Sequence, residues 1–68
     1  MMRLKITTTA GVLEYDDVKE YAWGFIFFFI ARKNMTDRVN RDMIITIDRW
    51  IESKWVRLPE RKKTARQT

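Results

Sequence analysis

The segment from Phe25 to Ile30 reads FIFFFI, six consecutive large apolar residues of which four are Phe, in a chain of 68 residues. Consecutive side chains of a strand point to opposite faces, so a strand built from this run has no polar face to turn towards water. The run is short, aromatic and bounded by residues typical of turns, Gly24 before it and Lys33-Asn34 after it. We therefore expect Phe25 to Arg32 to form a buried central strand, covered on both faces by the rest of the chain or by a partner.

The chain is close to the lower size limit for a self-sufficient core, and it has no Cys with which to form disulfides. Each Phe of the run would contribute about 2–3 kcal/mol if it were fully buried. The net stability of such a domain is still only a few kcal/mol. A homodimer or an obligate complex with another protein would compensate for the small core.

Two segments before the Phe run show the alternation of apolar and polar residues that is typical of half-buried strands. The first is Arg3 to Thr9 and the second is Val12 to Asp16, with Ala10-Gly11 between them as a tight hairpin turn. Asp16-Asp17 indicates a bend or bulge. The following segment, Val18 to Trp23, is either a short helical turn or a continuation of the second strand.

The segment from Met35 onward supports two interpretations. The β-branched residues of Met43 to Ile47 favour strands, with residues 40–42 as a tight turn and Ile44 to Ile51 as the last strand. The apolar residues also recur at spacings of three and four, which is typical of a helix over about residues 36–56. We favour a mainly β fold, a small antiparallel sheet or barrel. The alternative is an α+β fold, a three-stranded antiparallel sheet packed by one long C-terminal helix.

The order of hairpin, aromatic strand, tight turn and final strand, with the turn in Val39-Asn40-Arg41-Asp42-Met43-Ile44, resembles small SH3-like or Sm-like β-barrels. In size and organisation the chain also resembles small accessory proteins of bacterial phages and mobile elements. The resemblance covers roughly residues 3–51. It implies a small barrel, and no functional residue is carried over from it.

The charge of the chain is unevenly distributed. Of the total net charge of +5, the last 12 residues carry +4, from five cations less Glu60: Arg57, Arg61, Lys62, Lys63 and Arg66. A local patch of −3 comes from four acids less Lys19: Glu14, Asp16, Asp17 and Glu20. We expect one domain over residues 1–58 and a basic, flexible tail over residues 59–68.

The residue types present argue against an enzyme. The chain has no His and no Cys, so Ser53 and the threonines lack the usual general base. Two glycines cannot supply a phosphate-binding loop, and no spacing matches a metal site, so we expect no catalytic residue, cofactor or metal. The longest apolar stretch, Tyr21 to Ala31, is too short to cross a bilayer as a helix, and the absence of Cys fits the cytoplasm.

Two functions fit these observations. The first is a small non-enzymatic protein-binding module, a phage-type inhibitor similar in size to anti-CRISPR and other anti-defence proteins, that occupies a surface of a host protein. Its expected contacts are an anionic surface and one exposed aromatic: Glu14, Asp16, Asp17, Glu20 and Trp55. Trp50 is expected in the core. The alternative is a nucleic-acid-binding barrel or regulator that contacts phosphates through its basic tail, helped by Arg38, Arg41 and Arg49. The tail residues are Arg57, Arg61, Lys62, Lys63 and Arg66.

Overall fold

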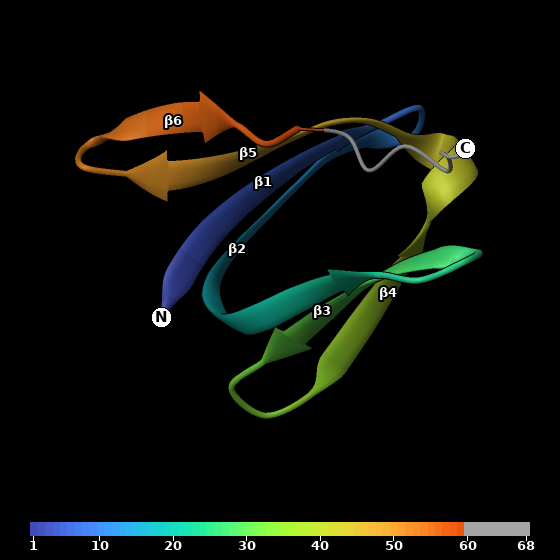
Figure 1. Ribbon diagram of the computed structural model, residues 1–68, viewed down its shortest axis with the longest axis horizontal. Helices are drawn as coiled ribbons and strands as arrows, with labels where there is room; N and C mark the ends of the chain where they lie inside the picture. Colours follow the sequence, from blue (N-terminus) through green and yellow to red (C-terminus); the bar gives the residue numbers. More distant parts are fainter. Residues whose placement is uncertain (60–68) are drawn as a thin grey trace.

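A computed structural model describes residues 1–59, so the predicted basic tail lies, apart from Pro59, outside the described residues. The described chain consists of strands and one 3-10 turn (Figure 1). In chain order the elements are β1 (Met2–Thr8), β2 (Gly11–Trp23), β3 (Phe27–Arg32), β4 (Thr36–Asn40), η1 (Arg41–Met43), β5 (Ile44–Ile51) and β6 (Lys54–Arg57).

The six strands form one antiparallel sheet in the order β4-β3-β2-β1-β5-β6. The mainly β prediction is therefore confirmed, and the chain does not adopt the alternative helix over residues 36–56. The β-branched side chains of β5 favour an extended backbone, and this strand pairs with β1 along most of its length. Within residues 1–59 the one helical segment is η1, whose three residues fall far short of the length needed to cross a bilayer.

Strand β2 carries two extra residues relative to its neighbours. Between the pairs Met2–Val18 and Leu4–Tyr15 it has one residue more than β1, so the bulge predicted at Asp16-Asp17 is confirmed. A second register shift, in the pairing with β3, follows directly after Val18. Bulges bend the strand that contains them, and Figure 1 shows β2 turning sharply along its length, which brings β3 and β4 across from β1 and β5. The predicted first hairpin is confirmed, and Val18 to Trp23 continues its second strand.

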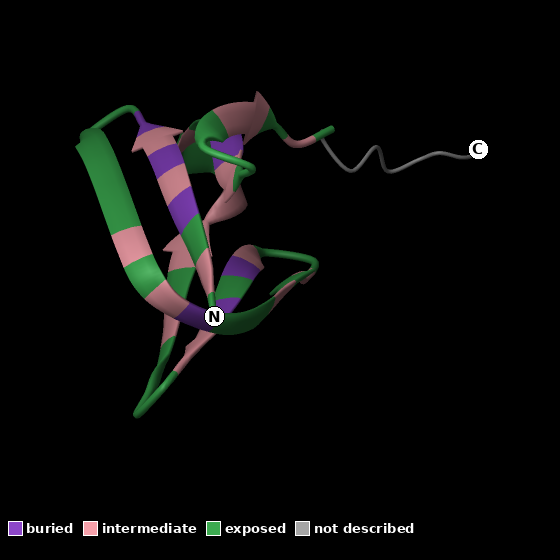
Figure 2. Cartoon of the chain, turned by 90° about the vertical axis from the view of Figure 1, so that its left-hand side faces the viewer, coloured by how far each residue is buried: buried purple, intermediate pink, exposed green. Residues whose placement is uncertain are grey.

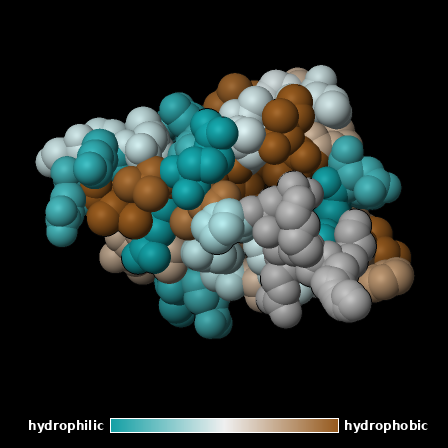
Figure 3. All heavy atoms as spheres, turned by 45° about the horizontal axis from the view of Figure 1, so that its top comes forward, coloured by the Kyte–Doolittle hydropathy of each residue, from teal (hydrophilic) through white to brown (hydrophobic). Residues whose placement is uncertain are grey.

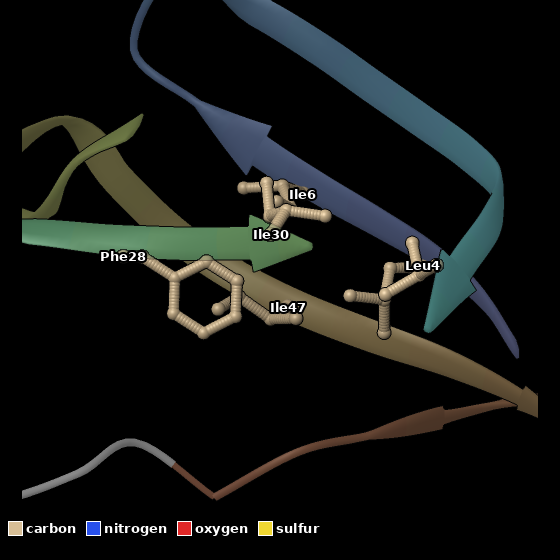
Figure 4. Packing of buried hydrophobic residues seen from close by; sticks show 6 residues of the cluster. Leu4, Ile6, Phe28, Ile30 and Ile47 are labelled. Atoms are coloured by element: carbon tan, nitrogen blue, oxygen red, sulfur yellow. The ribbon is translucent and has the colours of Figure 1, made fainter. Parts of the chain in front are cut away.

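The core lies inside this bend. In Figure 4, Phe28 and Ile30 of β3 face side chains of β1 and β5. Along β1 the buried residues alternate with more exposed ones, as the predicted period of two requires (Figure 2). The fully enclosed apolar residues come from four strands: Leu4, Ile6, Val18, Phe28, Ile30 and Ile47. The sheet thus supplies both walls of its own core.

The expectation that the whole Phe run forms a strand covered on both faces is wrong. Phe25 and Ile26 precede β3 and lie in the turn that joins it to β2. From Phe27 onward the side chains alternate, so that Phe28 is enclosed in the core while Phe29 on the opposite face remains 39% exposed. One bent sheet has a single inner face, and only alternate residues of β3 reach it.

Strand β6 was not expected from the sequence. Ile44 to Ile51 does form a strand, but β6 follows it after a two-residue turn in which Ile51 and Lys54 pair. The two turn residues, Glu52 and Ser53, have φ angles of 50° and 69°. Tight hairpin turns of this kind usually contain Gly or Asn, and their absence here conceals the turn in the sequence.

Neighbouring Phe residues test this assignment of faces. Phe28→Ala is expected to lower the free energy of unfolding by about 3–5 kcal/mol, the usual cost of truncating a buried aromatic residue. Phe29→Ala is expected to cost less than about 1.5 kcal/mol because its ring lies on the outer face. Urea denaturation followed by circular dichroism measures both values. Phe28→Leu, with an expected loss of about 1–1.5 kcal/mol, provides a second measurement at the buried position if Phe28→Ala does not fold. Equal losses at the two positions would contradict the structure.

Candidate binding surface

The β2–β3 turn presents two large apolar side chains to solvent. The backbone N–H of Gly24 donates to the carbonyl of Phe27 at 2.7 Å, which closes a turn with Phe25 and Ile26 at its centre. Phe25 is 92% exposed and Ile26 is 54% exposed. These positions usually hold Gly, Asn, Asp or Pro, so the chain places apolar residues where local structure does not call for them.

Arg41 of η1 holds this turn in place by two hydrogen bonds. Its backbone N–H donates to the carbonyl of Ile26 at 2.9 Å, and its Nη1 donates to the carbonyl of Gly24 at 2.8 Å. Its guanidinium also lies 5.1 Å from the ring centroid of Trp23. The β2–β3 turn and η1 accordingly lie at the same end of the molecule (Figure 1). The backbone and the side chain of Arg41 thus each donate a hydrogen bond that fixes the backbone carrying Phe25.

A hollow of about 750 Å3 lies beside this turn. Three segments border it: the β2–β3 turn, η1 with the start of β5, and the chain after β6. Arg41, Asp42 and Arg57 supply its charged lining. Its apolar lining includes Trp23, Phe25, Ile26, Ile45, Ile47 and Leu58.

Ile45 reaches the hollow because β5 contains a bulge. Thr7 pairs with Thr46 and Thr8 pairs with Ile44, so Ile45 is an extra residue without a partner position on β1. Its side chain is 61% exposed. We call Phe25, Ile26 and Ile45 the apolar corner, since these three exposed side chains border one hollow.

The four acids predicted to form an anionic surface are strung along β2 and do not form one cluster. Glu14 lies opposite Lys5 of β1, and the Asp17 carboxylate accepts a hydrogen bond from Arg32. Asp16 and Glu20 are exposed, on either side of the second bulge. The role of these acids in partner binding stays a prediction.

Arg32 is the last residue of β3, at the end of the strand away from the apolar corner. On the inner face of the sheet it links three strands. Its Nε donates to Oδ1 of Asp17 in β2 at 2.9 Å, and its Nη1 donates to Oδ2 of Asp37 in β4 at 3.0 Å. Its guanidinium lies 5.0 Å from the ring centroid of Tyr15. The hydrogen bond from Arg32 lowers the pKa of Asp17, and the same contacts raise the pKa of Arg32. Burial, helped by the charge of Asp37, raises the pKa of Tyr15.

Trp50 and Trp55 lie on the outer face of the sheet, so the expectation of Trp50 in the core is wrong. The two residues pair directly across β5 and β6, with ring centroids 5.1 Å apart in an edge-to-face arrangement. The guanidinium of Arg3 lies 5.0 Å from the Trp50 ring, and Nζ of Lys5 lies 4.6 Å from the Trp55 ring. The cations of β1 thus occupy positions over these rings. A role for Trp55 in partner contact stays a prediction.

Charges alternate across this outer face. Lys5 of β1 lies between Glu14 and Asp48 in the register, and Nε of Arg57 donates to Oδ1 of Asp48 at 2.6 Å. Figure 3, in which the side of β5 and β6 comes forward, shows hydrophilic side chains interspersed with separate apolar patches. Arg57, a predicted phosphate contact, is therefore paired with an acid. The other four predicted contacts lie outside the described residues: Arg61, Lys62, Lys63 and Arg66.

Sequence reasoning missed the apolar corner, and it named Arg41 only as an accessory phosphate contact and not as a residue that holds this turn. Phe25 and Ile26 were assigned to the buried strand because they belong to an unbroken apolar run. The signal that could have separated them is Gly24, which directly precedes the two-residue turn between β2 and β3. Ile45 could not be assigned to either face from the sequence because the bulge in β5 depends on its pairing with β1.

No group of three Asp or Glu side chains within residues 1–59 is arranged to hold a metal ion. Comparisons of the chain with protein-family models, with curated proteins and with solved structures find no match. The apolar corner is therefore assigned on geometry alone.

Gly24→Ala is expected to disturb the turn. A Cβ at position 24 would lie 2.7 Å from the backbone oxygen of Phe27 and 2.6 Å from Cε2 of Phe29. Because the first of these contacts is with backbone, the turn itself must shift, and we expect a loss of about 1–3 kcal/mol in urea denaturation. Adding Phe29→Ala removes only the ring contact, so it should restore only part of the loss. Full recovery in the double variant would show that the backbone contact does not matter.

Arg32→Gln is expected to raise the pKa of Asp17 towards its ordinary value of 3.8, measured by NMR titration of the carboxyl carbon. A lowered folded-state pKa stabilises the fold above the unfolded value, and this contribution is lost as the pH falls through the folded value. The stability of the variant should therefore depend less on pH below about 4. Lys33→Gln is the matched control, since Lys33 is the weakest influence on Asp17. An unchanged Asp17 titration in Arg32→Gln would refute the pairing.

Proposed function

We propose that the chain is a non-enzymatic protein-binding module and that the apolar corner is its contact surface. The observation that carries this proposal is Phe25, a large aromatic side chain 92% exposed on a turn that Arg41 holds by two hydrogen bonds. Its exposure means that the ring contributes little to folding. A contact with another molecule accounts for its presence.

The arrangement of the apolar corner favours binding over chance exposure. Single exposed apolar residues are common on protein surfaces and need no explanation. Here Phe25, Ile26 and Ile45 border the same hollow, which also exposes Trp23 and Leu58 to a partner. Aromatic anchors on a fixed backbone lose little conformational freedom on binding, and such residues dominate the affinity of protein interfaces.

The lining of the hollow indicates the chemistry of the partner. Its charged side chains are two arginines, Arg41 and Arg57, against one acid, Asp42. Because Arg57 is already paired with Asp48, the apolar lining indicates the partner more than the charge does, and a protein surface with an apolar protrusion would fit the hollow. The sequence-based hypothesis was an inhibitor of a host protein. We propose that it acts by blocking such a surface.

The test uses the tagged full chain and three of its variants. Capture from nuclease-treated lysate identifies a candidate partner, which is then purified and titrated against wild type, Phe25→Ala, Ile26→Ala and Met35→Ala. Met35 is a matched control because it is 53% exposed in the turn at the other end of β3. We expect a stoichiometric complex that Phe25→Ala weakens at least tenfold, while Met35→Ala leaves the affinity within about twofold.

Thermal unfolding of the same variants separates contact from folding. Phe25→Ala should change the free energy of unfolding by no more than about 0.5 kcal/mol, because an exposed side chain loses little burial when truncated. A partner that binds Phe25→Ala and wild type equally well would refute the proposed surface. Loss of binding together with loss of stability in Phe25→Ala would also refute it, because the residue would then be structural.

A further inference from the structure

A second surface lies on the outer face of β3 and β4. Phe27 and Phe29 both point away from the core, with ring centroids 6.2 Å apart. Arg38 of β4 lies directly opposite Phe29, and its guanidinium lies 4.5 Å from the ring centroid of Phe27. We call Phe27, Phe29 and Arg38 the aromatic face.

The neighbours of these rings are small. Ala22 of β2 lies opposite Phe29 on the same face, and Ala31 follows two positions later in β3. Gly24 has no Cβ to displace the Phe29 ring, which lies where that atom would be. The register places no Leu, Ile, Val or Met of β2, β3 or β4 on this face between Glu20 and Asn40. The rings therefore rise above their surroundings.

Among residues 1–59, no acid forms an ion pair with the cation of this face. Asp37, the acid of β4, is engaged by Arg32 on the inner face. Arg38 contacts an aromatic ring, and no acid of residues 1–59 forms an ion pair with it. Glu20 is the acid that the register places on this face. A cation without an acid partner, next to two outward rings, suits a ligand that carries both planar groups and negative charge.

We infer that the aromatic face binds single-stranded nucleic acid. Bases stack on Phe29 and Phe27, and Arg38 contacts a phosphate or stacks on a base. Unpaired bases stack on aromatic side chains of sheet surfaces in this way because every base has a flat face. The net charge of +5 of the whole chain assists by attracting a polyanion.

The test is fluorescence anisotropy of the full chain with a fluorescein-labelled oligothymidine of twelve nucleotides, in 50 mM and 200 mM salt. We expect binding that weakens at the higher salt. Phe29→Ala should weaken it roughly tenfold or more, and Phe29→Trp should preserve it. Arg38→Ala should weaken binding and reduce the slope of log affinity against log salt concentration by about 1, as expected for the loss of one phosphate contact.

Matched controls separate stacking from general charge attraction. Arg3→Ala removes an arginine that also lies over an aromatic ring, but on the part of the outer face formed by β1, β5 and β6, and it should change the affinity by less than about twofold. A duplex of the same length should bind more weakly than the single strand, because its bases are already stacked. A truncation that lacks residues 60–68 should retain the dependence on Phe29.

The inference would be overturned by no binding at 50 mM salt, or by equal affinity for duplex and single strand. It would also be overturned if Arg3→Ala and Arg38→Ala had equal effects. Binding that survives Phe29→Ala but is lost in the truncation would be a fourth contrary result. Because Arg38 is exposed at the sheet edge, its variant is informative even if Phe29→Ala proves unstable. Phe25→Ala should leave oligonucleotide binding within about twofold. The outcome is therefore independent of the protein contact proposed at the apolar corner.

Discussion

The two extra residues of β2 are the constraint on which the rest of the structure depends. They bend the sheet between β1 and β3, so that one layer of strands closes over its own inner face. Without this bend, Phe28 and Ile30 would have no opposing side chains, since the described chain supplies no second sheet and no packing helix. The bend also brings η1 next to the β2–β3 turn, where Arg41 holds the residues that we propose to contact a partner.

Much of the strand pattern could be predicted from local sequence. The first hairpin and the turn at residues 40–42 depend mainly on neighbouring residues, and the adjacent acids Asp16-Asp17 indicated the bulge in the pairing of β2 with β1. β6 could not be predicted, because Glu52 and Ser53 adopt positive φ without the usual turn residues. The Phe run was misread because an unbroken apolar sequence gives no sign of which residues lie in a turn, which face the core and which face solvent.

The candidate surfaces were harder to predict than the fold for a related reason. Charge and aromatic content can be counted in the sequence, but pairing decides whether they are available. Pairing assigns Asp17 to Arg32 and Arg57 to Asp48, whereas Phe25 and Arg38 remain exposed. Two separate surfaces result, the apolar corner beside a hollow and the aromatic face with its cation. The apolar corner includes the turn that precedes β3, and the aromatic face begins with the first residue of β3.

The division of the Phe run has a consequence for how such a protein can change. Phe28 and Ile30 serve the fold, whereas Phe25 and Ile26 are held in place by backbone contacts that do not depend on their own side chains. Substitutions of Phe25 and Ile26 can therefore accumulate under selection for a new target with little loss of stability. The residues proposed to set partner specificity and the residues that stabilise the fold are neighbours in one short segment but are not the same residues. A very small protein of this kind can therefore acquire a new partner while it keeps its fold.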